Sequence, residues 1–211
     1  MTIRHHLSDP LLMAYAAGNL PEAFGLVAAT HVSMCDECRA RLGAFEAVGG
    51  AVVETAEAVA VSDTSLAAVL ARLGTPEAPQ PVAKRSFFPA PLADYVGGDL
   101  AAVNWRPLGM GVRQAILPTS KGASARLLYI PAGHSVPDHG HRGTELTLVL
   151  RGAFSDSTDR FGAGDIEIAT EDLNHTPIAE AGEDCICLAA TDAPLRFHAL
   201  LPRLLQPLFR I

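Results

Sequence analysis

The chain has 211 residues, of which 49% are hydrophobic and 18% are charged, as in a folded globular protein. A chain of this length forms one large domain or two small ones, and the change in pattern along it favours two. The net charge of −7 argues against direct binding to nucleic acid, because neutralising phosphates requires a basic surface. A protein partner is therefore expected, and a basic one suits this charge.

The sequence indicates neither a membrane span nor a secretion signal. No run of about eighteen uncharged apolar residues occurs, and the opening MTIRHHLSDP lacks the apolar centre of a signal peptide. The four cysteines form two close pairs, Cys35 with Cys38 and Cys185 with Cys187. Such pairs suit metal or thiol chemistry in a reducing compartment better than long-range disulfides, so we expect a cytoplasmic protein.

The first third of the chain has the pattern of a small helical bundle. Ser8 can cap the first helix, and glycines follow the apolar stretches where helices are expected to end. The expected helices cover residues 10–18, 21–31, 33–49 and, after Ser62 or Asp63, a fourth segment up to Gly74.

The fourth expected helix carries an apolar face with the i, i+3, i+4, i+7 spacing of an amphipathic helix. Two interpretations stay open. The face packs on the other three helices, as most such faces do, or a partner protein covers it, because so small a bundle has little core to offer. The residues of this candidate partner-binding face are Leu66, Val69, Leu70 and Leu73.

The segment HVSMCDEC places His31, Cys35 and Cys38 at the spacing of a zinc site. Residues three and four apart share a helix face, so all three side chains can reach one ion. Structural zinc takes four ligands, and we predict His6 as the fourth, with His5 as the open alternative. Two rival interpretations are cysteines that are simply buried, and a redox CxxC, which should open a helix after a strand.

A proline-rich segment, TPEAPQPVAKRSFFPAP at residues 75–91, follows the helical part. Proline removes backbone donors and keeps the chain extended, which predicts a tether between a helical domain over 1–85 and a β-rich domain over 92–211. The second domain is expected to be a small antiparallel β-barrel or jelly roll, so the fold class is two-domain α + β. Its expected strands cover residues 125–133, 145–154, 160–169, 185–190 and 196–201.

A second group of metal-binding residues lies in this β-rich part. His139 and His141 alternate by two, so both imidazoles face one side of an extended segment, and Glu145 returns to that face along the next strand. His175 follows the GAGD turn at residues 162–165 and is the expected fourth ligand. Three imidazoles and one carboxylate suit Zn2+ or another divalent transition metal.

This spacing, GxxxxxHxHxxxExxxxxxG, resembles the first motif of the cupin family in full. The second cupin motif is matched only by the glycine turn and by His175, because the usual proline and the closing asparagine are absent. The resemblance covers roughly residues 100–200 and implies that His139, His141, Glu145 and His175 hold the cupin metal.

Cys185 and Cys187 lie two apart on an expected strand, so both thiols should face one side of the sheet. If that side is the interior of the barrel, they lie near the metal and are a candidate redox pair. The alternative is that each is a small buried hydrophobic residue, which is the commoner role of a buried cysteine.

A helical module with His6, His31, Cys35 and Cys38, followed by a tether and a cupin barrel, resembles the ChrR-type zinc-binding anti-sigma factors over essentially the whole chain. The resemblance implies binding rather than catalysis: the module inhibits an extracytoplasmic-function sigma factor in a 1:1 heterodimer. It also implies that the cupin barrel senses an oxidative signal of the singlet-oxygen type, which releases the sigma factor and so regulates transcription.

The charge of the first part agrees with such a target. Up to residue 74 it has four arginines and eight acidic residues, and a DNA-binding partner must carry basic patches. The rival function is a metal-dependent cupin enzyme, a dioxygenase or isomerase, that uses the zinc module for assembly. Against it, no further acid, base or nucleophile is visible near the cupin motif apart from Tyr129.

Overall fold

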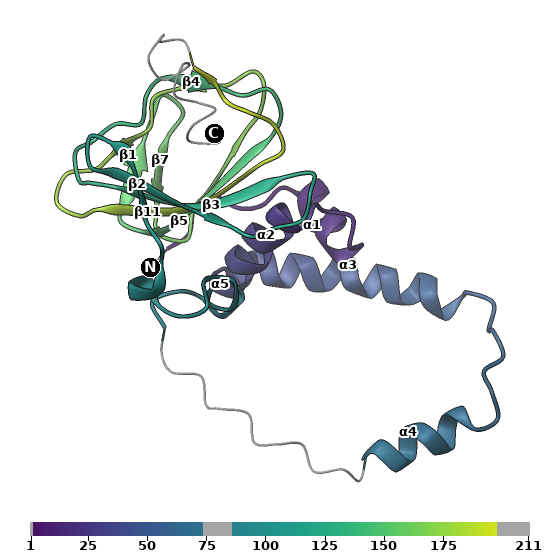
Figure 1. Ribbon diagram of the computed structural model, residues 1–211. Helices are drawn as coiled ribbons and strands as arrows, with labels where there is room; N and C mark the ends of the chain where they lie inside the picture. Colours follow the sequence, from purple (N-terminus) through teal and green to yellow (C-terminus); the bar gives the residue numbers. More distant parts are fainter. Residues whose placement is uncertain (1, 74–85, 198–211) are drawn as a thin grey trace.

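The computed structural model describes residues 2–73 and 86–197 and shows helices followed by a β-sheet-rich part, as the sequence predicts (Figure 1). The four helices expected in the first third of the chain form, and one additional helix lies just before the strands. The helices are α1 (Asp9–Ala16), α2 (Glu22–Met34), α3 (Asp36–Glu54), α4 (Ser65–Leu73) and α5 (Ala90–Val96), with a short 3-10 helix at Leu100–Ala102.

The boundary between α2 and α3 positions the cysteine motif. α2 runs past its expected end to Met34, and Cys35 is the N-cap of α3, where its sulfur accepts the N–H of Cys38 at 3.4 Å. The break expected at Gly49 and Gly50 is wrong, because α3 continues through both glycines to Glu54. A helical glycine costs only about 1 kcal/mol relative to alanine, and no proline follows to stop the helix.

The β-rich part consists of antiparallel strands in three sheets, which confirms the cupin, jelly-roll class, although the strands do not close into one continuous barrel. The largest sheet has the order β1-β2-β3-β11-β5-β8, and the smaller sheets are β10-β6-β7 and β12-β4-β9. The strands are β1 (Arg106–Gly109), β2 (Val112–Leu117), β3 (Ser124–Ile130), β4 (His139–Gly140), β5 (Glu145–Arg151), β6 (Ala153–Ser155), β7 (Arg160–Gly162), β8 (Ile166–Ala169), β9 (Asn174–His175), β10 (Ile178–Ala179), β11 (Cys185–Thr191) and β12 (Arg196–Phe197).

Two expected strands are each divided by a turn. The segment 145–154 becomes β5 and β6 at Gly152, which has φ +69° and whose added Cβ would lie 2.6 Å from the carbonyl oxygen of Asp184. The segment 160–169 becomes β7 and β8 around the turn at residues 162–165. The last expected strand, 196–201, is described only as far as Phe197, and its other residues lie outside the described part of the chain.

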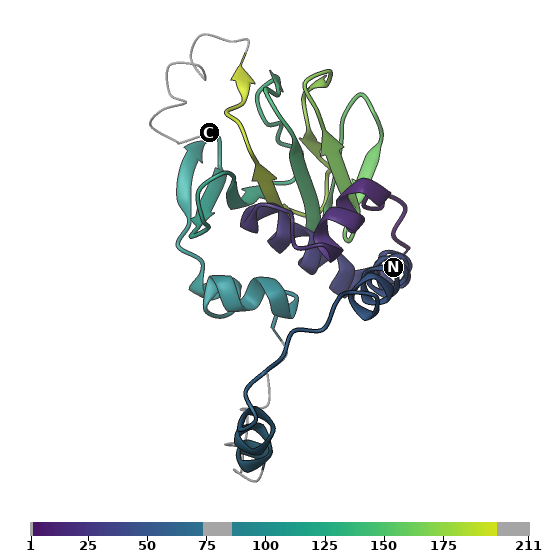
Figure 2. The same cartoon turned by 90° about the vertical axis from the view of Figure 1, so that its right-hand side faces the viewer.

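The helical part packs directly on the largest sheet. α2 contacts β3, β5 and β11 on one side and is also in contact with α3 and α5, so it connects these two helices to the sheet (Figure 2). Val27 and Ala28 of α2 belong to the same hydrophobic core as Leu127, Leu148 and Leu188 of the sheet. The two parts of the chain therefore share one core.

The expected tether is in part a structured element. Residues 74–85 lie outside the described part of the chain, but Phe88 is buried and α5 begins at Ala90, inside the expected tether of 75–91. Leu92 of α5 is fully buried against α2. The division into domains at 1–85 and 92–211 stays a prediction, since the two parts share these contacts.

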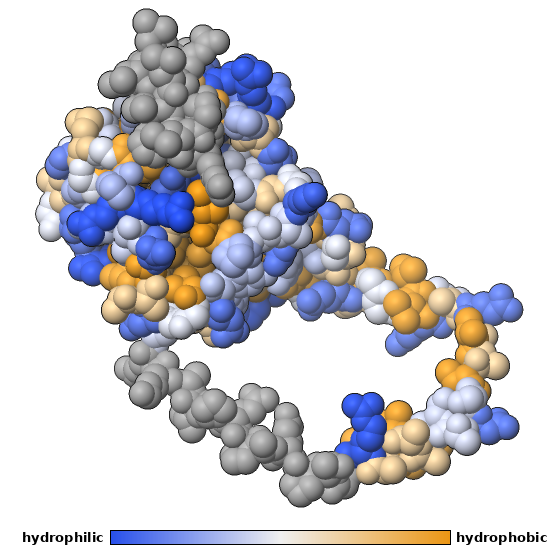
Figure 3. Space-filling model, in the orientation of Figure 1, coloured by the Kyte–Doolittle hydropathy of each residue, from blue (hydrophilic) through white to orange (hydrophobic). Residues whose placement is uncertain are grey.

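α4 stands apart from the rest of the molecule in both views (Figures 1 and 2). None of its nine residues is buried, and its apolar side chains form an exposed patch (Figure 3). The interpretation in which this face packs on the other three helices is therefore wrong. The exposed fractions are 68% for Leu66, 55% for Val69, 56% for Leu70 and 74% for Leu73.

Candidate metal centres and partner-binding face

The structure brings His6, His31, Cys35 and Cys38 together, with one donor atom of each within 4.8 Å of the others. The Nδ1 of His6 lies 3.3 Å from the Cys35 sulfur and 3.7 Å from the Cys38 sulfur, and the Nε2 of His31 lies 3.3 Å from the Cys38 sulfur. Zinc–sulfur and zinc–nitrogen bond lengths place such atoms about 3.5 Å apart on a tetrahedron. These four residues, the N-terminal quartet, fit a tetrahedral zinc ion.

Burial adjusts the protonation of the quartet. It lowers the pKa of His31 to about 4, which keeps the imidazole neutral at pH 7. Burial first, and then the neighbouring Cys35, raise the pKa of Cys38 to about 11. Without a cation the thiol keeps its proton, whereas a divalent ion would stabilise the thiolate, so metal binding here is coupled to proton release.

His5, the open alternative for the fourth ligand, lies elsewhere. Its Nε2 is 3.1 Å from a carboxylate oxygen of Asp159, and its ring lies on Phe161 with 4.4 Å between centroids. The ring of His6 instead reaches both sulfurs and has its other nitrogen 3.3 Å from Glu37. The geometry thus gives the position in the quartet to His6.

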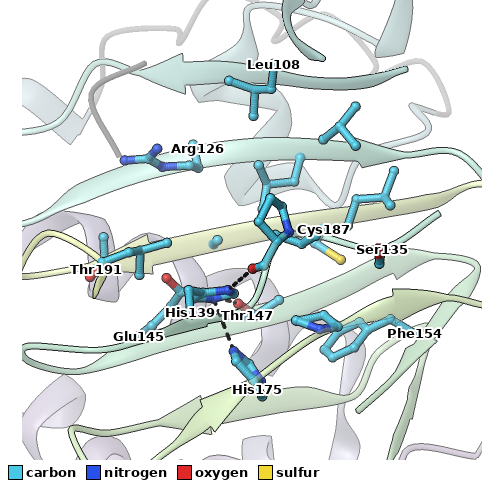
Figure 4. Close-up of a pocket in the computed structure, with 18 of the residues that line it drawn as sticks. Leu108, Arg126, Ser135, His139, Glu145, Thr147, Phe154, His175, Cys187 and Thr191 are labelled. Atoms are coloured by element: carbon cyan, nitrogen blue, oxygen red, sulfur yellow. Dashed lines mark hydrogen bonds between the residues drawn. The ribbon is translucent and has the colours of Figure 1, made fainter. Parts of the chain in front are cut away.

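A second group, the barrel cluster, consists of His139, His141 and His175 (Figure 4 shows two of them). The backbone register of β4 and β9 places His139 opposite His175. The Nε2 of His175 lies 3.2 Å from that of His139 and 3.3 Å from that of His141, and all three residues are buried. Three imidazoles on one tetrahedral or octahedral ion would have nitrogens about 3 Å apart, so the cluster fits a shared metal.

Glu145 is placed at the same cavity but outside the group of three whose donor atoms lie within 4.8 Å. Its carboxylate accepts a hydrogen bond from the Thr147 hydroxyl at 3.1 Å. Its charge acts on His139 and His141 and raises the pKa of each, although burial lowers both pKa values more. Glu145 thus faces the cluster as an acidic neighbour.

Two acidic residues that sequence reasoning missed contact His175. The Nδ1 of His175 lies 2.6 Å from Asp156 and 3.2 Å from Glu167, and all three side chains are buried. Burial alone would lower the pKa of His175, but these carboxylates raise it to about 9, while burial raises the pKa of Glu167 to about 7. A signal was available: Glu167 is the one polar residue of the apolar strand IEIA.

A cavity of about 360 Å³ opens beside the barrel cluster (Figure 4). Its wall is mostly apolar, with His139, His175 and Glu145 at one side. Binding sites for small molecules have this size and this mixture of apolar wall and few polar groups. The apolar residues of the wall include Leu108, Val112, Leu128, Ile130 and Phe154.

Cys185 and Cys187 face the same side of β11, as their spacing predicts, with 3.5 Å between the sulfurs. Both are buried, and Cys187 lines the cavity. Contact with Cys185, together with burial, raises the pKa of Cys187 well above that of a free thiol. The raised pKa favours the thiol form of Cys187, whereas the thiolate is the more nucleophilic form, and the redox role of the pair stays a prediction.

No helix in the described part of the chain is both long and apolar enough to cross a membrane. The candidate partner-binding face of α4 is the largest group of exposed leucines in that part.

Comparisons with known proteins agree with these features. Residues 94–194 match the family model described as the ChrR cupin-like domain. The anti-sigma-E factor ChrR of Cereibacter sphaeroides is 66% identical over the whole of both chains. A crystal structure of Rhodobacter sphaeroides SigE in complex with the anti-sigma ChrR contains a chain of 66% identity that covers 90% of this chain and all of its own, with a TM-score of 0.82. This chain therefore belongs to the ChrR family of anti-sigma factors.

Proposed function

We propose that this protein binds an extracytoplasmic-function sigma factor as a 1:1 complex and inhibits transcription from its promoters. The observation that carries the proposal is the 66% identity, over the full length, to an anti-sigma factor whose family is known in complex with a sigma factor. The exposed leucines of α4 support it, because a helix with a bare apolar face is suited to binding a partner. The proposed function is regulatory rather than catalytic.

The N-terminal quartet is proposed to bind zinc and so to build the sigma-binding module. Two thiols and two imidazoles are a ligand set that suits zinc, and the separations of their donor atoms fit a zinc tetrahedron. An ion held by His6 and by the α2–α3 junction would join the start of the chain to the helices. The energy of binding such an ion contributes directly to folding.

The barrel cluster is proposed to hold a second divalent transition metal, with Glu145 as a further ligand, and to receive the oxidative signal. The apolar cavity beside it would admit a small molecule to the metal and to Cys187. Release then requires two states of different affinity for the sigma factor. The contacts of α2 with the sheet, in addition to the tether, would allow a structural change in the barrel to reach the helical part.

The test is a pair of double substitutions in the full chain. Cys35→Ser with Cys38→Ser should remove the quartet metal and abolish capture of the sigma factor, measured by metal analysis and co-purification. Cys185→Ser with Cys187→Ser makes the same chemical change in the buried barrel pair and should leave capture intact. If the first variant still captures the sigma factor, the quartet does not build the binding module.

A further inference from the structure

The start of the chain is attached to the barrel by one buried carboxylate. Asp165 is 3% exposed and lies in the turn between β7 and β8. Its Oδ1 accepts the backbone N–H of Arg4 at 2.6 Å and of His5 at 2.9 Å, and its Oδ2 accepts the N–H of Gly162 at 2.8 Å. The next residue, Ile166, donates its N–H to the His5 carbonyl at 3.3 Å. Four hydrogen bonds thus converge on this turn, and three of them come from about 160 residues away.

These bonds are of the strong kind. Burial of Asp165 would raise its pKa, but the N–H groups of Arg4, Gly162 and His5 lower it below the usual range, so the carboxylate is charged. Hydrogen bonds to an ionised acceptor are about twice as strong as neutral ones, and strength increases where water is excluded. The backbone of residues 4 and 5 is therefore fixed by the barrel.

His6 follows directly, and consecutive Cα atoms are only about 3.8 Å apart. Fixing the backbone at His5 thus limits where the His6 ring can lie.

We propose that Asp165 is a positioning residue for the N-terminal metal site, so that the affinity of the quartet for its ion depends on the barrel. The inference rests on the proposed role of the quartet in binding metal. The turn continues into β8, whose Glu167 contacts His175 of the barrel cluster. One short segment, residues 162–167, therefore contacts both the backbone next to His6 and His175 of the barrel cluster.

The test is a cobalt titration of the full-length chain after removal of metal. Charge-transfer absorption from thiolate to Co2+ reports a site with cysteine ligands and leaves a site of histidines unseen. Asp165→Asn and Arg4→Pro each remove part of the attachment, the second by deleting the Arg4 N–H while leaving the barrel turn unchanged. Each should weaken Co2+ binding at the quartet about 10- to 100-fold, as losses of residues that orient metal ligands do.

The double variant should be no weaker than the stronger single variant, because both changes break the same attachment. Asp159→Asn is the matched control: it contacts the His5 ring but not the backbone, and its affinity should stay within twofold of the wild type. Absence of the thiolate band in the wild type would overturn the metal site itself. A normal band with unchanged affinity in both variants, or a loss confined to Asp165→Asn, would overturn the positioning role.

Discussion

The exposed face of α4 allows a quantitative prediction for binding of the sigma factor. Full burial of a leucine side chain stabilises by about 1.5–3 kcal/mol. Leu66 and Leu73 retain 68% and 74% of their exposure in the free chain, so a partner that covers either one can gain about 1–2 kcal/mol. Since 1.4 kcal/mol is a factor of ten, Leu66→Ala or Leu73→Ala should raise the Kd about 5- to 30-fold.

The assay is titration calorimetry of each full-length variant against an extracytoplasmic-function sigma factor. Val59→Ala is the control, because Val59 is 87% exposed but lies before α4 and outside its apolar face. Its Kd should remain within twofold of the wild type, and the Tm of all free variants should be unchanged, since none of these side chains is buried. A Kd within twofold for both leucine variants would refute the assignment of this face to the partner.

Three further predictions concern acid, a strained turn and the barrel cluster. In the metal-free chain the pKa of His31 is about 4 when folded and about 6.5 when unfolded, so the unfolded state binds more protons between these values. The free energy of unfolding should therefore fall as the pH decreases from 7 to 4, and His31 should contribute up to about 3 kcal/mol of this loss. Urea titrations of His31→Gln should show a weaker dependence of the free energy of unfolding on pH. Gly152→Ala should lower the free energy of unfolding by more than about 2 kcal/mol, because the added Cβ would meet a backbone carbonyl. Gly133 has a similar φ but open space around it, so Gly133→Ala should lower the free energy of unfolding by about 1 kcal/mol. Thermal melts of the two variants measure the difference. Asp156→Asn should weaken metal binding at the barrel cluster about 10-fold or more, measured by chelator competition, while cobalt–thiolate absorption at the quartet is retained; equal affinities would contradict a role in orienting His175.

Short-range patterns predicted much of the candidate sites. His31, Cys35 and Cys38 are close in sequence and meet at the junction of α2 and α3, where Cys35 is an extended N-cap and not part of one helix face. The alternation of His139 and His141 places both on one side of an extended segment. The amphipathic pattern located α4 to within a residue or two, and its exposure settled an alternative that periodicity leaves open. The sequence was therefore sufficient to predict contacts between residues that lie within a few positions of one another.

Sequence patterns did not predict the contacts between segments that are far apart in the chain. The carboxylate of Asp165 meets backbone groups of residues 4 and 5, and backbone N–H groups leave no trace in the side-chain pattern. Asp156 reaches His175 across 19 positions through a strand pairing that no motif records. The docking of α2 on the sheet had a weaker signal, because the stretch AFGLVAAT has no charged residue and is buried on several sides.

The two-sided burial of α2 affects how the protein can be dissected. A chain truncated after about residue 90 would lack the β-sheet on which Val27 and Ala28 pack, and this apolar face of α2 would be exposed to water. In such a fragment, loss of the barrel that is proposed to sense the signal could not be told apart from loss of the sheet that supports the sigma-binding module. Point substitutions in the cavity keep the sheet under α2 in place, so they separate the loss of sensing from the loss of structural support.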